Sequence, residues 1–261
     1  GPLCGYLLAQ YGAQVIKADP PSSIHPIMLM VGMGAGQGKR SILTDVKTAP
    51  GREIYKRLVS WADVVFHNSL DDTAERLGVS HAQLQAVNAD VVACQISCFG
   101  GTWRGGWEMR TGFEPILQCA SGLMAHYGTL EQPQWHGMGS TTDAIGGVCL
   151  AFTVLLGAYQ KRTSGHAGEC RTSLAHAINY MQLPWMISEN GNCDRGDARG
   201  PFALGENWWQ RMYACCDGWI YVGTRTNRAG HLAEVVTGQQ DSDEHTLETA
   251  FAQHGCAHWL A

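Results

Sequence analysis

The first hundred residues alternate between apolar strand patterns and helical patterns, and this alternation limits the possible folds more than any other feature. Strand patterns occupy residues 14–18 (QVIKA), 63–68 (DVVFHN) and 90–98 (DVVACQISC). Between them, residues 50–62 repeat apolar side chains at helical spacing, and Ser80-x-x-Gln83 forms a capping box that opens a short helix. Strands that alternate with helices predict an α/β fold with a doubly wound, Rossmann-like parallel sheet.

The centre of the chain carries longer helical patterns. Residues 111–125 and 142–162 each predict a helix, and the second of these is long and apolar. Residues 168–174 predict a strand, and residues 175–189 predict a further helix that is interrupted near Pro184. We expect all of these segments to belong to the same large domain.

Composition changes after residue 190 and suggests a second domain. Residues 190–207 are rich in Gly, Asn, Asp and Arg, which is typical of a linker or an active-site loop. Asp217-Gly218 then separates two apolar runs, which is a strong signal for a β-hairpin. We therefore expect a large domain over residues 1–205 and the beginning of a smaller α+β domain over residues 206–261.

Composition also excludes several classes of protein. The formal net charge is −5, so the basic face that nucleic acids or anionic membranes require is not expected. No apolar run is expected to span a membrane. The ten cysteines show no CxxC spacing, and the eleven histidines show no HExxH spacing. We interpret the cysteines as reduced thiols of a cytoplasmic protein, and we expect no metal site.

Asp143 is the strongest candidate for a catalytic side chain. It lies in the segment 140–147 (STTDAIGG), at the start of the long apolar helix pattern. Aspartate often occupies this place as a simple cap, because its oxygens accept hydrogen bonds from free backbone amides. Gly146 and Gly147 follow one turn later and would let a ligand or another backbone approach. Glu114, near the start of the preceding helix pattern, could form a carboxylate pair with Asp143.

The glycine-rich segment 32–41 (GMGAGQGKRS) superficially suggests a nucleoside-triphosphate loop. That motif requires glycine at position 33, which is Met33, and serine or threonine at position 40, which is Arg40. We therefore interpret the segment as a flexible loop in which Lys39 and Arg40 form a plain cationic site for a phosphate.

Short motifs are spread along the chain in a consistent order. They are Gly1-Pro2, Leu8-Ala9, Gly12-Ala13, Val15-Ile16-Lys17, Lys39-Arg40-Ser41-Ile42, Asp45, Lys47, Ala62-Asp63-Val64, Asn68, Arg76-Leu77-Gly78, Gln118 to Gly122, Gly157 to Gly165, Tyr213 and Asp217-Gly218. This order resembles the class III CoA-transferases, a family that includes the formyl-CoA, carnitine and bile-acid enzymes and the related α-methylacyl-CoA racemases.

The resemblance implies a reaction and a set of site residues. Asp143 takes the place of the family's nucleophile, which carries the acyl group as a mixed anhydride and then CoA as a thioester. Glu114 matches an active-site glutamate, and Asn68 and Arg76 match residues that contact CoA. Acyl-CoA and a carboxylate are then substrates, with no tightly bound cofactor. The family also implies an interlocked homodimer.

Two departures from the family pattern leave alternatives open. Phe113-Glu114 stands where the racemases carry histidine and aspartate, so racemase or isomerase activity is the weaker interpretation. Leu70-Asp71-Asp72 stands where the family often has Arg-Pro-Gly, which replaces a cation by two anions on the expected phosphate path. A degenerate, non-catalytic CoA-binding half of a tandem transferase is therefore a second candidate.

The resemblance also suggests that the 261 residues are a fragment. The family's opening strand would precede Gly1, and the small domain would continue past the last residues. We expect such a fragment to associate or dissolve poorly and to show no transferase activity alone, because unpaired strand groups and uncovered apolar surface are unfavourable.

Overall fold

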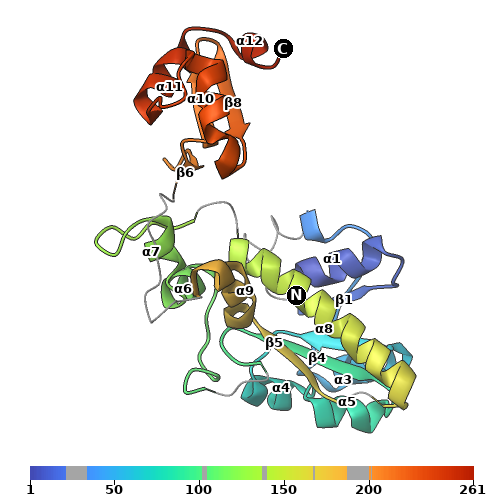
Figure 1. Ribbon diagram of the computed structural model, residues 1–261. Helices are drawn as coiled ribbons and strands as arrows, with labels where there is room; N and C mark the ends of the chain where they lie inside the picture. The colour runs from blue at the N-terminus through green and yellow to red at the C-terminus, as the bar shows by residue number, and fades with distance from the viewer. Residues whose placement is uncertain (22–33, 102–104, 137–139, 167, 187–199, 201) are drawn as a thin grey trace. The chain divides into compact units, whose positions relative to one another are not determined.

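The computed structural model describes residues 1–21, 34–101, 105–136, 140–166, 168–186, 200 and 202–261 (Figure 1). The chain divides into two compact units, which are described separately. Unit 1 comprises residues 1–124 and 135–189, and unit 2 comprises residues 125–134 and 190–261.

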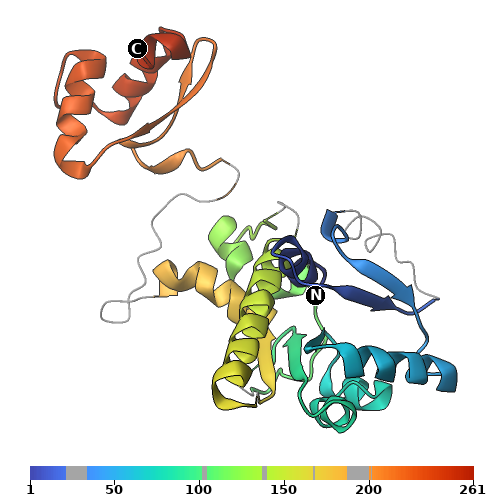
Figure 2. The ribbon, with the colours of Figure 1, turned by 90° about the vertical axis from the view of Figure 1, so that its right-hand side faces the viewer.

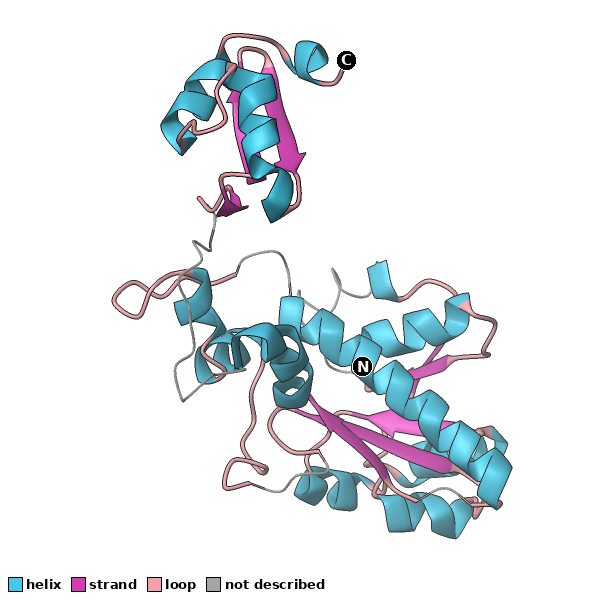
Figure 3. Ribbon diagram, in the orientation of Figure 1, coloured by secondary structure: helices cyan, strands magenta, loops and turns pink. Residues whose placement is uncertain are grey.

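Unit 1 contains two parallel sheets. β1 (Ile16–Asp19) pairs with β2 (Arg40–Leu43), and β4 (Val92–Ser97) lies between β3 (Val64–His67) and β5 (Cys170–Ser173). Figure 3 shows these strands among the helices of an α/β unit. The helices with most of their residues in unit 1 are α1 (Pro2–Gln10), α3 (Ala49–Trp61), α4 (Asp71–Leu77), α5 (His81–Val87), α6 (Glu114–Ala120), α8 (Thr141–Ser164) and α9 (Leu174–Met186). The prediction of a mixed α/β fold with parallel strands is confirmed.

β4 forms the centre of unit 1 because both of its faces are covered. Val92, Cys94 and Ile96 pack with α8 residues that include Leu150 and Val154. The intervening side chains point the other way, so Ala93 packs with Val59 of α3 and Leu84 of α5. Figures 1 and 2 accordingly show α8 across one face of the sheet and α3, α4 and α5 on the opposite face. This double burial explains the continuous apolar run in the sequence.

The predicted helix starts are visible in local hydrogen bonds. Thr48 caps α3, because its hydroxyl oxygen accepts a hydrogen bond of 3.2 Å from the amide of Gly51. At α5, the amide of Ser80 donates to the side-chain oxygen of Gln83 at 3.3 Å. The predicted capping box is therefore confirmed.

The single helix predicted over residues 111–125 is wrong in its continuity. The structure has α6, which begins only at Glu114, and a separate short helix, α7 (Leu123–Tyr127). Gly122 separates them with a φ of +80°, a left-handed conformation that favours glycine and ends α6. The pattern of apolar residues continues across this break, which is why periodicity alone does not reveal it.

The long apolar helix predicted over residues 142–162 is α8 (Thr141–Ser164). It differs from the expectation that no apolar run is long enough to span a membrane. By length and composition it meets the requirement for a membrane-spanning helix. Core helices of globular domains meet the same requirement. In unit 1, α8 packs against α1, α9, β4 and β5, and its buried residues include Leu150, Ala151 and Val154.

Unit 2 contains an antiparallel sheet and short helices. β6 (Gly205–Asn207), β7 (Gln210–Cys215) and β8 (Gly218–Gly223) lie in that order, and α10 (Ala229–Thr237), α11 (Glu244–Ala252) and α12 (Cys256–Trp259) follow. Tyr213 stacks on Phe251 with 4.5 Å between ring centroids, and Leu247 completes this core. Two residues, Cys216 and Asp217, connect β7 to β8, so the predicted hairpin is confirmed.

Candidate active site at the start of helix α8

The chain enters α8 through an unusual backbone conformation. Ser140, the N-cap residue, has φ 61° and ψ 46°, and it is the only non-glycine residue with a positive φ in the described part of the chain. Such a conformation costs roughly 1–2 kcal/mol. Its side chain makes no capping hydrogen bond, so the first amides of α8 need another acceptor.

Glu114 of α6 is that acceptor. Its carboxylate is buried, with 5% of the residue exposed. The carboxylate accepts hydrogen bonds from the amide of Thr142 at 3.0 Å and from the amide of Asp143 at 2.7 Å, and also from the Thr142 hydroxyl. A residue 29 positions away therefore caps the helix that carries Asp143.

Gln118 and His136 hold this carboxylate in place. The side-chain amide of Gln118 donates to Glu114 at 2.7 Å and to the His136 carbonyl at 3.2 Å, and its oxygen accepts from the His136 amide at 2.9 Å. The His136 ring lies 2.9 Å from the Thr141 hydroxyl in the first turn of α8. Gln118 is fully buried, so α6, the segment at His136 and α8 form one fixed frame.

The two carboxylates titrate in opposite directions. Burial alone would raise the pKa of Glu114, but hydrogen bonds from Thr142, Gln118 and the Asp143 amide outweigh it, and the net pKa is lowered. The pKa of Asp143 is raised, first by partial burial and then by the nearby charge of Glu114. A helix N-terminus ordinarily favours the ionised form of an aspartate. The structure differs because Glu114 already uses the first amides of α8.

Cys98 is a further neighbour of Asp143. Cys98 lies close enough that burial and then the Asp143 charge raise the pKa of its thiol to about 12. Cys98 is therefore a neutral thiol at physiological pH. Gly112 passes directly beside it, since a Cβ at position 112 would lie 2.2 Å from the Cys98 sulfur. This close approach brings the segment that carries Glu114 onto the end of β4.

Gly146 and Gly147 lie in packing contacts of α8. A Cβ on Gly146 would meet the Leu174 side chain at 2.2 Å, and a Cβ on Gly147 would meet the Leu3 Cβ at 2.8 Å. The two glycines thus allow α9 and α1 to approach α8 closely. Their role in holding a developing oxyanion stays a prediction.

The predicted cationic residues lie at the start of β2. The Lys39 ammonium donates to the Pro2 carbonyl at 2.9 Å, and burial followed by the charge of Lys17 lowers the pKa of Lys39. Arg40 is exposed at the start of β2. Lys39 therefore supports the start of α1, while Arg40 is accessible to a ligand.

Asn68 and Arg76 occupy the connection that follows β3. Asn68 is exposed directly after the carboxyl end of that strand, where parallel sheets commonly bind ligands. Arg76 is exposed in the last turn of α4 and donates to the Thr73 hydroxyl at 3.3 Å. A pocket open to solvent lies beside this connection and is lined by Leu70, Asp71, Gln95, Ser97, Gly100, Gly101, Glu108, Met109 and Arg171.

Possible metal ligands are not clustered in the part of the chain that the structure describes. No group of three or more His, Cys, Asp or Glu side chains there is arranged to hold a metal ion. In unit 2, His254 and His258 stack with 4.0 Å between ring centroids. This pair has the HxxxH spacing but lacks a third ligand among the described residues.

Several named proteins are similar to this chain in sequence. The protein is 30% identical over 266 residues to the CoA-transferase/lyase DddD of Marinomonas sp. (strain MWYL1), covering 100% of this chain and 32% of that protein. It is 32% identical over 176 residues to the succinyl-CoA–D-citramalate CoA-transferase of Chloroflexus aurantiacus, covering 63% of this chain and 43% of that one. The chain thus spans less than half the length of either relative.

Solved structures share the fold. A CAIB/BAIF family protein from Brucella suis superposes with a TM-score of 0.80 at 21% identity, covering 99% of this chain and 76% of that chain. The protein Rv3272 from Mycobacterium tuberculosis gives a TM-score of 0.79 at 20% identity, with coverages of 99% and 74%. The sequence model of CoA-transferase family III matches residues 1–256. The chain therefore belongs to CoA-transferase family III.

Proposed function

We propose that this protein transfers CoA from an acyl-CoA thioester to a carboxylate acceptor, with Asp143 as the nucleophile. One observation carries the proposal: a partly exposed carboxylate with a raised pKa lies in the first turn of α8, and the buried Glu114 fixes its backbone. A carboxylate of raised pKa is a better nucleophile than an ordinary one, provided that it stays ionised at the working pH.

The proposed reaction proceeds through a mixed anhydride and an aspartyl-CoA thioester on Asp143. A carboxylate oxygen of Asp143 attacks the thioester carbonyl, the carbon–sulfur bond breaks, and CoA leaves as a thiolate, so that Asp143 carries a mixed anhydride. The thiolate then attacks the Asp143 acyl carbon and releases the donor's carboxylate, which leaves an aspartyl-CoA thioester. The acceptor carboxylate repeats both steps in reverse order and departs as its CoA thioester. Asp143 is regenerated, and no water is consumed.

Glu114 favours the first step electrostatically. While Asp143 is ionised, the Glu114 charge raises its free energy, and this repulsion contributes to the raised pKa of Asp143. Formation of the anhydride removes the charge on Asp143 and relieves the repulsion. Relief that occurs only as the reaction proceeds lowers the barrier, which is the requirement for catalysis. In the resting state both Glu114 oxygens hold α8, so Glu114 acts by positioning and charge.

CoA would enter as a substrate along the carboxyl end of β3. Asn68 offers a donor and an acceptor there, while Arg76 offers an exposed guanidinium group for phosphate. Arg40, at the start of β2 in the other sheet of unit 1, is a second exposed guanidinium that we propose for phosphate. We propose Lys39 as a further phosphate contact; in the resting structure its ammonium donates to the Pro2 carbonyl at the start of α1. We propose, in addition, a homodimer in the cytoplasm with no resident cofactor. Light scattering and localisation of a tagged protein would test the assembly and the compartment.

A second function has support from one specific feature. Leu70-Asp71-Asp72 places two carboxylates beside Asn68, as a CoA site under relaxed selection would. The protein would then be a non-catalytic CoA-binding half of a longer transferase. Racemase or isomerase activity has less support, because Phe113 occupies the place where a second base would be required.

Trapping of the acylated carboxylate distinguishes these functions. We expect incubation with acyl-CoA and then hydroxylamine to leave a hydroxamate on the peptide that contains Asp143, as detected by mass spectrometry. Asp143→Asn should abolish both the adduct and the transfer activity. Asp72→Asn, on the exposed side of α4, provides a charge-matched control and should keep the adduct. An adduct that persists in Asp143→Asn would place the nucleophile elsewhere.

A further inference from the structure

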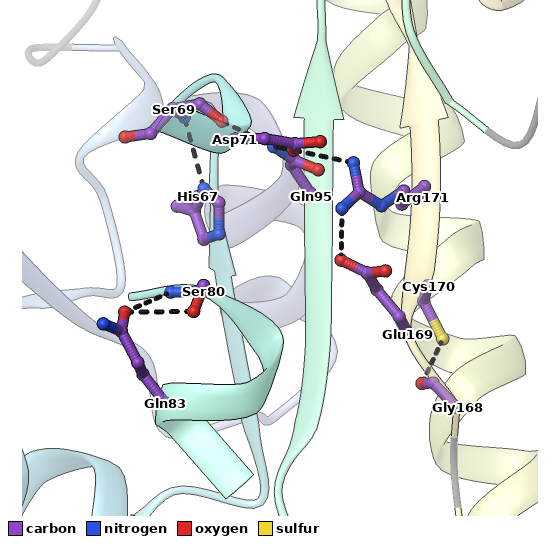
Figure 4. Close-up of polar contacts among 10 residues, drawn as sticks. All are labelled: His67, Ser69, Asp71, Ser80, Gln83, Gln95, Gly168, Glu169, Cys170 and Arg171. Atoms are coloured by element: carbon purple, nitrogen blue, oxygen red, sulfur yellow. Dashed lines mark hydrogen bonds and ion pairs between the residues drawn. The ribbon is translucent and has the colours of Figure 1, made fainter. Parts of the chain in front are cut away.

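Three polar side chains form a row across the central sheet of unit 1. His67 pairs with Gln95 in the register of β3 and β4, and Gln95 pairs with Arg171 in the register of β4 and β5. Figure 4 shows this row on one side of the strands. Because side chains alternate along a strand, Gln95 points to the same face of the sheet as Val91 and Ala93. This is the face that α3 and α5 cover. Polar groups on a covered sheet face are unfavourable unless they find partners.

Ser69, the residue after Asn68, is the first partner. Its amide donates to the His67 ring nitrogen Nδ1 at 3.2 Å, and its carbonyl accepts from the Gln95 side-chain amide at 2.6 Å. Both backbone polar groups of Ser69 are thus bonded to side chains of the sheet. This arrangement fixes the backbone immediately beyond Asn68.

Asp71, two residues further on, is the second partner. The Gln95 amide donates to its carboxylate at 3.0 Å, and the Arg171 guanidinium donates to the same oxygen at 2.8 Å. Arg171 also pairs with Glu169 at 2.5 Å. The Arg171 side chain is only 20% exposed, so solvent screens this ion pair less than it screens a surface pair.

We propose that Arg171 is a positioning residue for CoA binding. Its bond to Asp71, together with the bonds of His67 and Gln95 to Ser69, holds the 69–71 backbone in one conformation. The Arg171 charge also offsets that of Asp71 beside the phosphate path. The inference rests on the proposed function, since it takes Asn68 to contact CoA. The family often has an arginine in the loop where this chain has Leu70-Asp71-Asp72. In this chain Arg171 of β5, about 100 residues later, supplies a cation to the same loop.

A purely structural ion pair between β5 and α4 would behave differently from a positioning residue. Loss of a structural pair lowers stability and the amount of folded enzyme, which reduces apparent kcat. Loss of a positioning residue instead weakens CoA binding in the folded enzyme, so KM for acyl-CoA and Kd for CoA rise while kcat changes little. It also releases Asp71 and so loosens the backbone of residues 69–72, which hydrogen exchange measures directly.

The test compares Arg171→Met with matched variants of the full chain. We expect Arg171→Met to raise the calorimetric Kd for CoA and the KM for acyl-CoA about tenfold, the scale of one charge-assisted hydrogen bond, with kcat within about twofold. Amide exchange at residues 68–72 should accelerate. Arg171→Lys should retain part of the affinity. Arg57→Met is the control: Arg57 is exposed on α3, lies 3.7 Å from Glu53, and should change none of these values.

A second variant removes the anion that Arg171 offsets. Asp71→Asn in the Arg171→Met background should recover part of the CoA affinity, because it removes the negative charge that Arg171 no longer offsets. Loss of a structural tie alone would not be repaired in this way. If Arg171→Met does not fold, Arg171→Lys and Asp71→Asn give the same comparison at smaller amplitude.

Asn68→Ala distinguishes a failure of the proposed CoA site from a failure of the role assigned to Arg171. Unchanged CoA affinity in Asn68→Ala would remove CoA from this loop and contradict the proposed CoA site itself. Weaker affinity in Asn68→Ala, together with unchanged affinity and unchanged exchange in Arg171→Met, would overturn the role of Arg171 alone. Weaker affinity in both variants, with faster exchange at residues 69–72 in Arg171→Met, supports the inference.

Discussion

At the scale of single residues, Asp143 is placed where its charge is unfavourable for folding. Its pKa in the folded protein lies above the unfolded value because of burial and Glu114. A raised carboxyl pKa means that the ionised group destabilises the fold at neutral pH. We therefore expect Asp143→Asn to raise the free energy of unfolding at pH 7 by roughly 0.2–1 kcal/mol, the range for partly exposed charge pairs. Urea unfolding of the wild type and of Asp143→Asn would measure this difference in the free energy of unfolding.

The pH dependence of the stability gain in Asp143→Asn provides the control for this prediction. As pH falls through the folded pKa of Asp143, the wild-type carboxyl becomes neutral and the gain from asparagine should shrink. Glu114 behaves oppositely, because its pKa is lower in the folded protein than in the unfolded chain. It therefore stabilises the fold at pH values above its unfolded pKa, and this stability is lost as pH falls through its folded pKa. Glu114→Gln should therefore destabilise the protein at pH 7. An Asp143→Asn variant less stable than wild type at pH 7 would contradict the unfavourable placement of its charge.

At the scale of elements, α8 depends on a close contact with α1. Alanine normally stabilises a helix by about 1 kcal/mol relative to glycine. At Gly147, however, the new Cβ would lie 2.8 Å from the Leu3 Cβ, which cannot rotate away. Because overpacking costs about 1–3 kcal/mol, we expect Gly147→Ala to lower stability by about 1 kcal/mol in urea unfolding. Val148→Ala, at an exposed position of the same helix, should change it by less than about 0.5 kcal/mol.

The same elements show how far sequence patterns reach. The strand over residues 90–98 is predictable because both of its faces are apolar, and the α5 capping box is predictable because its partners are three residues apart. The cap that Glu114 supplies to α8 is not predictable by local rules, because 28 residues separate it from Thr142. The pairing of Arg171 with Asp71 across 100 residues is likewise set by strand order. Gln95, a polar residue inside an apolar strand, is the one local sign of that network.

At the scale of the whole molecule, the proposed homodimer needs a surface that a second copy would cover. Helix α8 offers exposed apolar side chains along one side, namely Val148, Phe152, Leu155, Leu156 and Tyr159. Their spacing of three, four and seven residues places them on a common stripe. Contiguous exposed apolar surface of this kind marks association sites.

If the stripe lies in the dimer interface, Phe152→Glu should bury a charge there and shift the protein to the monomer mass in light scattering. Tyr11→Glu, at a position that is 90% exposed and outside the stripe, should leave the mass unchanged. A Phe152→Glu protein that keeps the dimer mass and its thermal stability would exclude α8 from the interface, and the copies would have to meet through another surface.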